Sequence, residues 1–245
     1  MPPDPPVEEI AVSDVLLSNF APHFRATPVD LRQDAVLTRE IQKLRFDVYC
    51  LECRFLSAKD YPDGLESDER DQTSAHFCSH HAQGELAGYV RLAFAAADGR
   101  FPFQEHGAQV YGQTVLPPVD QAAEVSRLMV SKVFRRRRGD IVSGVNEAAL
   151  DAPPDERRIA SPQILLSLYR KMYHYSNAHG IRYWYAAMER SLVRSLSRFG
   201  FQFEQIGPEL EYYGAVASYM VDLRQLEVQG QKMRPELWAW LASTD

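Results

Sequence analysis

The chain of 245 residues has few cysteines, no long apolar run and no excess of positive charge. Three cysteines are too few for the disulfide framework of a small secreted domain, and they fit a reducing compartment. No apolar stretch approaches the ~20 residues that a membrane-spanning helix requires. The proline-rich, acidic start lacks the basic and apolar regions of a signal peptide. The net charge of −6 argues against nonspecific nucleic-acid binding. These absences predict a cytoplasmic protein that binds no nucleic acid and has no membrane span.

Several familiar motifs are also missing. The sequence has no G-x-G-x-x-G, Walker or G-x-S-x-G motif, so it gives no support to a nucleotide-binding domain or a serine hydrolase. Cys50 and Cys53 have the CxxC spacing of a zinc site. No second CxxC accompanies them, and the histidines near Cys78 do not have zinc-finger spacing. Ordinary core cysteines are the favoured interpretation, and no metal is predicted.

The order of periodic segments predicts an α/β (α+β) domain with one mixed sheet. The first eight residues are expected to be a disordered tail, and residues 9–245 a single domain with an inserted loop near 143–160. A short helix is possible at 9–20. Strands are predicted at 24–31, 74–81, 85–94, 122–130, 181–188, 201–206 and 212–222. Helices are predicted at 34–53, 163–179 and 192–199, and a last helix contains Trp238 and Trp240.

Charged residues interrupt segments that otherwise have the pattern of buried structure. Arg91 lies inside the apolar strand 86–94, and Glu124 and Arg127 precede the apolar run 128–130. Because such side chains are rarely buried without a partner, they favour a shared polar site. On a regular strand Glu124 and Ser126 share one face, and Arg127 lies on the other. Each residue taken alone also fits a structural ion pair.

Three further charged groups extend this set. Arg45 lies on the face of an apolar helix, and Asp68 and Asp71 follow a turn in an acidic segment that is equally consistent with a solvated loop. The strongest basic run is 135–138, four consecutive arginines. This run fits a solvated helix start, a nucleic-acid-binding patch or a binding site for an anionic ligand or partner. The net negative charge of the chain disfavours nucleic acid.

The spacing of these residues resembles one family. Arg45, Tyr49, Phe55, Asp68, Asp71, Arg91 and the sequence Glu124-x-Ser126-Arg127 occur in the order found in acyl-homoserine lactone (autoinducer) synthases and their relatives, the long-chain N-acyl amino acid synthases. Residues 48–52 and 60–66 look more like the acyltransferase branch associated with PEP-CTERM/exosortase systems. The resemblance covers about residues 40–130 in detail, and the rest only by the order of elements.

The resemblance implies a GNAT-type fold, which is a splayed mixed sheet of about seven strands flanked by helices. Strands 122–130 and 181–188 would separate to admit a pantetheine arm, with helix 163–175 lining an acyl tunnel. The GNAT phosphate loop is half present, since Arg136 and Gly139 fit the motif and Ile141 does not. An acyl carrier protein is therefore the expected donor, with acyl-CoA as an alternative and no bound cofactor. Lys132, Arg135, Arg136, Arg137 and Arg138 would form a docking surface for that acidic carrier.

The resemblance also implies an N-acyltransferase that moves a medium- or long-chain acyl group to an amino acid or related amine. Glu124 would be the base, with Ser126 and Arg127 beside it as catalytic residues. Arg45, Tyr49, Phe55, Asp68, Asp71 and Arg91 would form the acceptor site and its ion-pair network. A nucleophilic role for Cys50 is disfavoured, because nothing nearby in sequence lowers its pKa.

Lactone synthases usually carry Phe and Trp where this chain has Tyr49 and Phe55. Adenosylmethionine use and lactone formation are thus less favoured than transfer to an amino acid. A CoA-dependent acetyltransferase and a non-catalytic acyl sensor are two further candidate functions.

Overall fold

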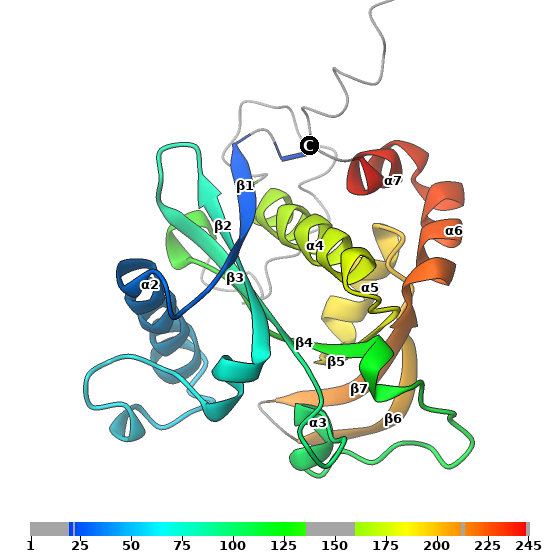
Figure 1. Ribbon diagram of the computed structural model, residues 1–245, viewed down its shortest axis with the longest axis horizontal. Coiled ribbons are helices and arrows are strands. Elements are labelled where there is room, and N and C mark those ends of the chain that lie inside the picture. Colours follow the sequence, from blue (N-terminus) through cyan, green and yellow to red (C-terminus); the bar gives the residue numbers. More distant parts are fainter. Residues whose placement is uncertain (1–19, 22, 136–159, 212–213, 244–245) are drawn as a thin grey trace, which may run out of the picture.

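Seven strands form one mixed sheet in the order β1-β2-β3-β4-β5-β7-β6 (Figure 1). The computed structural model describes residues 20–21, 23–135, 160–211 and 214–243. The strands are β1 (Phe24–Val29), β2 (Ser74–His81), β3 (Leu86–Ala93), β4 (Ala122–Val130), β5 (Tyr183–Met188), β6 (Glu204–Glu211) and β7 (Ala215–Asp222). The mixed sheet with flanking helices confirms the predicted fold class. Every predicted strand is present, with ends shifted by a few residues.

Six α-helices accompany the sheet in the described part of the chain. They are α2 (Ala35–Phe46), α3 (Pro102–Glu105), α4 (Ala160–Ala178), α5 (Arg190–Arg198), α6 (Leu223–Met233) and α7 (Pro235–Ala242). The sequence pattern does not predict α3 or α6. Among the described residues no helix is both long and apolar enough to cross a bilayer. The predicted tail at 1–8 and nearly all of the possible helix 9–20 and the inserted loop lie outside the described residues.

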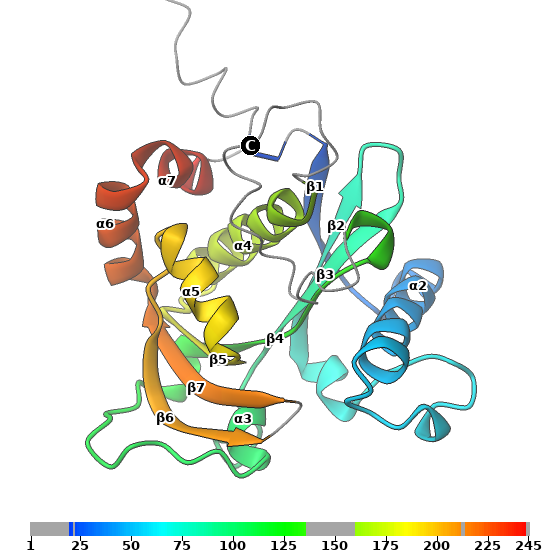
Figure 2. The same ribbon diagram turned by 180° about the vertical axis from the view of Figure 1, so that it is seen from behind.

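The two halves of the sheet meet along a short seam. β4 and β5 pair in parallel at three positions, Ala122 with Tyr183, Ala123 with Trp184 and Glu124 with Tyr185. The remaining pairs are antiparallel. Beyond Glu124 the two central strands no longer pair, and the view from behind shows them diverging (Figure 2). The sheet is therefore splayed where the sequence predicted an opening.

The two faces of the first half carry different cores. On one face, α4 packs Ile164, Leu168 and Met172 into the main core with Val90 and Leu92. On the other face, α2 and the residues after it form a smaller core with Cys78 of β2, Tyr89 of β3 and Met129 of β4. A β-carbon at Gly88 would lie 2.5 Å from Ile164 Cγ2 and 3.0 Å from the Met129 carbonyl oxygen. Glycine at this position lets α4 lie close against the sheet.

The helix predicted over 34–53 changes character within that range. Regular α-helix ends at Phe46, and Asp47–Glu52 forms a π-helical turn. The Cys53 amide donates to the Val48 carbonyl oxygen at 2.9 Å, a five-residue spacing. Such turns occur frequently at functional sites because they redirect side chains within a helix. Here the turn carries Tyr49.

Candidate functional site

Three arginines and three carboxylates form a cluster of ion pairs on the α2 side of the sheet. We call it the ion-pair cluster, and its members are Arg45, Glu66, Asp68, Asp71, Arg91 and Arg127. Helix α2, strands β3 and β4 and the loop before β2 each contribute to it. Five of the six are predicted site residues. The sixth, Glu66, is not predicted.

Arg45 is the buried centre of the ion-pair cluster. Its side chain and that of Glu66 are both 0% exposed, and Arg45 Nε donates to Glu66. Arg45 Nη1 donates to Asp71 Oδ1 at 2.7 Å, and its Nη2 lies 3.7 Å from Asp68 Oδ2. Burial opposes charge on Glu66, but the guanidinium groups of Arg45 and Arg127 outweigh it and lower the pKa of Glu66. Glu66 therefore stays ionised, as the partner of a buried guanidinium must.

The spacing of Asp68 and Asp71 has a local structural cause. Asp68 caps the 3₁₀ turn Glu69–Thr73, and its Oδ1 accepts from the Arg70 amide at 3.0 Å. Asp71 Oδ2 in turn accepts from the Asp68 amide at 3.1 Å, which completes a reciprocal capping box. The two carboxylates also accept hydrogen bonds from the guanidinium groups of Arg45, Arg91 and Arg127. One pair of aspartates thus fixes the loop and orients the ion-pair cluster.

Arg91 links the aspartates to strand β4. Its Nη1 donates to Asp71 Oδ1 at 2.7 Å and also to Asp68, while its Nε donates to Ser126 Oγ at 3.0 Å. Cross-strand pairing of Arg91 with Ser126 sets this contact. Ser126 is thus placed as a support for the arginine.

The prediction that Arg127 faces away from Ser126 is wrong. A β-bulge lies in β4 at this point, since Tyr89 pairs with Met129 but Arg91 pairs with Ser126. Arg127 takes φ +54°, in the left-handed region, which breaks the two-residue alternation. Its Nη2 reaches Glu66 Oε1 at 3.1 Å and Asp68 Oδ2 at 3.0 Å. The bulge therefore returns the guanidinium to the ion-pair cluster.

The cluster meets solvent at three of its members, Asp68, Arg127 and Asp71, the last with 11% of its side chain exposed. The side chain of Asp68 is 24% exposed and that of Arg127 is 14% exposed, whereas Arg45 and Glu66 are fully buried. Burial alone would raise the pKa of Asp68, but Arg91 and Arg127 lower it to about 2. Asp68 is therefore an anion at neutral pH. Asp68, Asp71 and Arg127 are the members placed to meet a ligand.

Two predicted aromatic residues extend the site from the π-helical turn. The guanidinium carbon of Arg127 lies 4.9 Å from the centre of the Tyr49 ring, a cation–π contact. Tyr49 and Phe55 pack edge to face with ring centres 5.9 Å apart. The Phe55 amide also donates to the Tyr49 carbonyl oxygen at 2.8 Å. The Tyr49 ring thus contacts Arg127, and Phe55 packs against Tyr49.

Glu124 is buried apart from the ion-pair cluster, at the last pair of the seam. Its Oε2 accepts a hydrogen bond from the Phe103 amide at 2.8 Å, and the side chain is almost fully buried. Desolvation raises its pKa to about 7, although the Phe103 amide and the positive charge of nearby arginines act in the opposite direction. A carboxyl group that titrates near neutral pH can accept and release a proton during a reaction.

His76 and Tyr89 form a buried chain that sequence reasoning missed. His76 Nε2 lies 2.8 Å from the Asp71 carbonyl oxygen, and its Nδ1 lies 2.7 Å from Tyr89 Oη. Burial lowers the pKa of His76, which favours the neutral ring. Because a carbonyl oxygen only accepts, Nε2 carries the proton and Tyr89 donates to Nδ1. The signal available in the sequence was that Tyr89 lies two residues from Arg91 on one strand, and therefore on the same face of the sheet.

A cavity of about 460 Å³ opens beside the two aspartates. Its wall includes Asp68, Asp71 and His76 together with Gln42 and Tyr175. Residues 28–32 at the end of β1 close it on another side. The ion-pair cluster is therefore one wall of an open space.

The predicted docking residues are only partly described. Lys132 lies in the exposed turn Lys132–Phe134 after β4. Arg135 forms an ion pair with Glu52. Arg136, Arg137 and Arg138 lie outside the described residues, as do Gly139 and Ile141. Cys50 is buried, and burial raises its pKa, which disfavours a thiolate. Among the described residues no group of three His, Cys, Asp or Glu side chains could hold a metal ion.

Comparison with known proteins agrees with this geometry. Residues 44–143 match the family model described as an acetyltransferase (GNAT) domain. The matched range contains nearly all of the site, from Arg45 to Arg127. The match confirms the prediction of an acyltransferase enzyme on a GNAT scaffold. No curated protein sequence matches the chain.

Three solved structures share the fold across most of both chains. The AHL synthase LasI aligns with a TM-score of 0.60 and 15% identity, covering 91% of this chain and 98% of that one. BjaI, a CoA-dependent acyl-homoserine lactone synthase solved with SAM and isopentyl-CoA, aligns with a TM-score of 0.60 and 18% identity, covering 89% and 98%. TofI, in a ternary complex with an inhibitor and MTA, aligns with a TM-score of 0.58 and 17% identity, covering 87% and 99%. At these identities the likeness is one of fold.

Proposed function

We propose that this chain transfers a medium- or long-chain fatty acyl group from acyl carrier protein to the α-amine of an amino acid or related small amine. The observation that carries the proposal is Glu124, a buried carboxyl group with a pKa near neutrality at the point where β4 and β5 separate. An ammonium group must lose a proton before its nitrogen can attack a thioester. We therefore assign the role of base in that step to Glu124.

The reaction takes place in a ternary complex without a covalent acyl-enzyme. Glu124 takes a proton from the ammonium group, directly or through water, and the amine nitrogen attacks the thioester carbonyl carbon. The nitrogen of the tetrahedral intermediate then loses its second proton to solvent. As the intermediate collapses, the carbon–sulfur bond breaks and the pantetheine sulfur leaves as a thiol with the proton from Glu124. Backbone amides of β4 beyond residue 124, which no longer pair with β5, support the oxyanion.

The cavity beside Asp68 supports an acceptor that carries a positive charge. Asp68 and Asp71 are held by the capping box before any ligand arrives, so the acceptor site is preorganised. Asp68 would attract the acceptor's ammonium group on its way to Glu124. Arg127, which is not in the cavity wall, would meet the acceptor's carboxylate at the exposed edge of the ion-pair cluster. Arg45 and Arg91 are too buried for that contact and position the aspartates instead.

The donor and the cellular context complete the proposal. We propose that the carrier protein docks on Lys132 and the arginine run 135–138. We also propose that the chain belongs to the PEP-CTERM/exosortase-associated branch. The acidic surface of a carrier protein complements such a basic run.

A product screen tests the proposal. The protein is incubated with a mixture of amino acids and adenosylmethionine, and with either acetyl-CoA or carrier protein loaded with acyl chains of several lengths. Products are identified by mass spectrometry. An N-acyl amino acid supports the proposal. An acyl-homoserine lactone, acetyl transfer from acetyl-CoA alone, or binding without product each contradicts it.

A variant separates catalysis from binding in the same assay. We expect Glu124→Gln to lose about 100-fold or more in turnover while still binding the loaded carrier. Glu204→Gln, on an exposed position of β6, is the matched control and should keep wild-type turnover. Near wild-type turnover in Glu124→Gln would remove Glu124 from the role of base.

A further inference from the structure

The two carboxylates that divide the proposed reaction, Asp68 and Glu124, lie on different elements. Asp68 caps the 3₁₀ turn before β2, whereas Glu124 lies in β4 at the last pair of the seam. An ionised carboxylate only accepts hydrogen bonds, so other groups must fix the position of one relative to the other. The contacts of Arg70, a residue that the sequence pattern did not single out, connect the two.

The backbone of Arg70 belongs to the turn that holds the aspartates. Its amide donates to Asp68 Oδ1 at 3.0 Å, and its carbonyl oxygen accepts from Ser74 Oγ at 2.6 Å. The residue lies between Asp68 and Asp71, inside the capping box. Arg70 is therefore fixed to the same turn as the two aspartates of the ion-pair cluster.

The side chain of Arg70 holds the segment 94–105, which runs from the end of β3 into α3. Its Nη1 donates to the Phe94 carbonyl oxygen at 2.9 Å, and its Nη2 donates to the Arg100 carbonyl oxygen at 3.4 Å. Nη2 also forms an ion pair with Glu105, the last residue of α3. The side chain is only 10% exposed. One guanidinium thus contacts the start, the middle and the end of this segment.

Helix α3 completes the connection to Glu124. The amide of Phe103, the second residue of α3, donates to Glu124 Oε2 at 2.8 Å. The rings of Phe101 and Phe103 lie 5.0 and 5.1 Å from the ring of Tyr185, which pairs with Glu124 across the seam. Helix α3 is therefore held by β5 through aromatic contacts and by the turn before β2 through Arg70.

We propose that Arg70 is a positioning residue that couples the turn carrying Asp68 and Asp71 to Glu124 through helix α3. The inference rests on the proposed acyl transfer, in which the acceptor passes from Asp68 to Glu124. Arginine suits this role because its planar fork reaches several acceptors in a fixed geometry. The single ammonium group of lysine carries the same charge but cannot reproduce that geometry.

The coupling should affect the protonation of Glu124. Desolvation raises its pKa, and the Phe103 amide is the strongest influence in the opposite direction. The nearby charges that also lower its pKa are those of Arg91, Arg70 and Arg127. A looser α3 would weaken the amide hydrogen bond, which stabilises the charged form, so the pKa of Glu124 would rise further. More of the base would then be protonated at neutral pH, and a higher pH would restore it.

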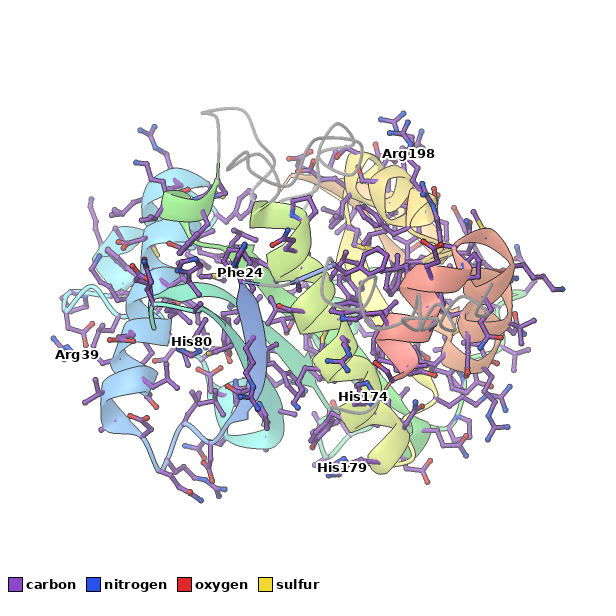
Figure 3. All side chains as sticks on the ribbon, turned by 90° about the horizontal axis from the view of Figure 1, so that it is seen from above. Phe24, Arg39, His80, His174, His179 and Arg198 are labelled. Atoms are coloured by element: carbon purple, nitrogen blue, oxygen red, sulfur yellow. The ribbon has the colours of Figure 1, made fainter. Side chains whose placement is uncertain are left out.

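The variant Arg70→Lys tests the coupling, because it keeps the charge near Glu124 and removes the fork. Carboxyl groups of ¹³C-labelled glutamate are titrated by NMR in the full chain without substrate, and the Glu124 signal is the one missing from Glu124→Gln. We expect its midpoint to lie about one pH unit higher in Arg70→Lys than in wild type. Arg39→Lys, at an exposed position whose side chain points outward from α2 in Figure 3, should leave the midpoint unchanged.

A second pair of variants covers the case in which Arg70→Lys does not fold. Glu105→Gln and Glu105→Ala remove the same charge from a side chain that is 31% exposed, but only glutamine keeps an oxygen that can accept from Arg70. Loss of a negative charge by itself favours ionised Glu124 equally in both variants. We therefore expect the Glu124 midpoint to be higher in Glu105→Ala than in Glu105→Gln.

Turnover provides a readout that a merely structural role would not move. In the product assay Arg70→Lys should lose about fivefold in kcat at pH 7 and less than about twofold at pH 9, as a base that titrates about one pH unit higher requires. Equal losses at the two pH values would overturn the inference. So would equal Glu124 midpoints in wild type and Arg70→Lys or, where that variant does not fold, in the two Glu105 variants.

The titration also separates this inference from the proposed function. A shifted midpoint in a chain that makes no N-acyl product would support the coupling and contradict the proposed acyl transfer. An unshifted midpoint in a chain that makes N-acyl amino acids would support the proposed function and contradict the coupling.

Discussion

Glu124 makes the protein's stability depend on pH in a predictable direction. Its pKa in the folded protein is about 7, against an ordinary value of 4.5. The folded state therefore holds this proton more tightly than the unfolded state does. Its stabilising effect is present below pH 4.5 and is lost as the pH rises through about 7. The difference amounts to about 3 kcal/mol at most.

Comparison with Glu124→Gln isolates this effect, because every other titrating group is retained. Between pH 4.5 and 8 we expect the free energy of unfolding of Glu124→Gln to rise by about 3 kcal/mol relative to wild type. Urea denaturation at several pH values measures it. A difference that does not vary with pH would show that Glu124 is not protonated in the folded state.

Removing Arg45 should be severe because its partners are buried with it. Arg45→Met leaves Glu66 without its closest partner in a site that water does not reach. We expect a loss of about 3–5 kcal/mol in the free energy of unfolding. Arg39→Met, on an exposed position of the same helix, should change it by less than about 0.5 kcal/mol. Similar losses in the two variants would show that helix α2, and not the ion pair, is the sensitive feature.

The sequence could indicate most members of the ion-pair cluster but not their contacts. The resemblance pointed to Arg45, Asp68, Asp71, Arg91 and Arg127, and the structure brings their side chains together. Glu66 lay within the acidic segment but carried no pattern of its own. Its importance comes from burial against Arg45, which depends on how the loop folds over α2 and β4.

At the scale of elements, the bulge in β4 decides which way Arg127 points. A regular strand would place it on the α4 face, away from Glu66 and Asp68. The sequence contains no glycine or asparagine here that would predict a left-handed residue. The backbone adopts φ +54° because the guanidinium is held by two carboxylates and the Tyr49 ring.

Because Arg127 has a positive φ, we expect its glycine and alanine variants to rank in stability in the opposite order from the one usual in a strand. Both Arg127→Gly and Arg127→Ala remove the guanidinium, but glycine adopts a positive φ without strain. We expect Arg127→Gly to be more stable than Arg127→Ala by about 1 kcal/mol in thermal or urea unfolding. At Val125, on a regular part of the same strand, the glycine variant should be the less stable one. Alanine as the more stable residue at both positions would mean that the bulge does not persist.

At the scale of the whole molecule, helix α4 connects the two halves of the sheet, which pair with each other at only three described positions. The main core contains Val90 and Leu92 from the first half of the sheet and Trp184 and Tyr219 from the second, with α4 packed against it. The sequence predicted the strands of each half from local periodicity. Strand order could not be predicted, because the pairing of β4 with β5 joins residues that are distant in sequence.

A core substitution in α4 should therefore weaken cooperativity as well as stability. We expect Leu168→Ala to cost about 2–5 kcal/mol. All three tryptophans lie at 184, 238 and 240, so their fluorescence reports the second half and α7, whereas far-UV circular dichroism reports the whole chain. In Leu168→Ala the two transitions should separate, while in wild type they coincide. Coincident transitions in the variant would contradict a coupling through α4.

The three-residue seam has one more consequence, which concerns selectivity. Where two strands pair along their whole length, hydrogen bonds fix their separation. Here β4 and β5 pair only up to Glu124, so the angle at which they diverge is set by the side chains packed beneath them. Under the proposed function, the width available to an acyl chain would then be a property of the α4 core. Substitutions in that core would change the preferred chain length without altering any residue of the ion-pair cluster.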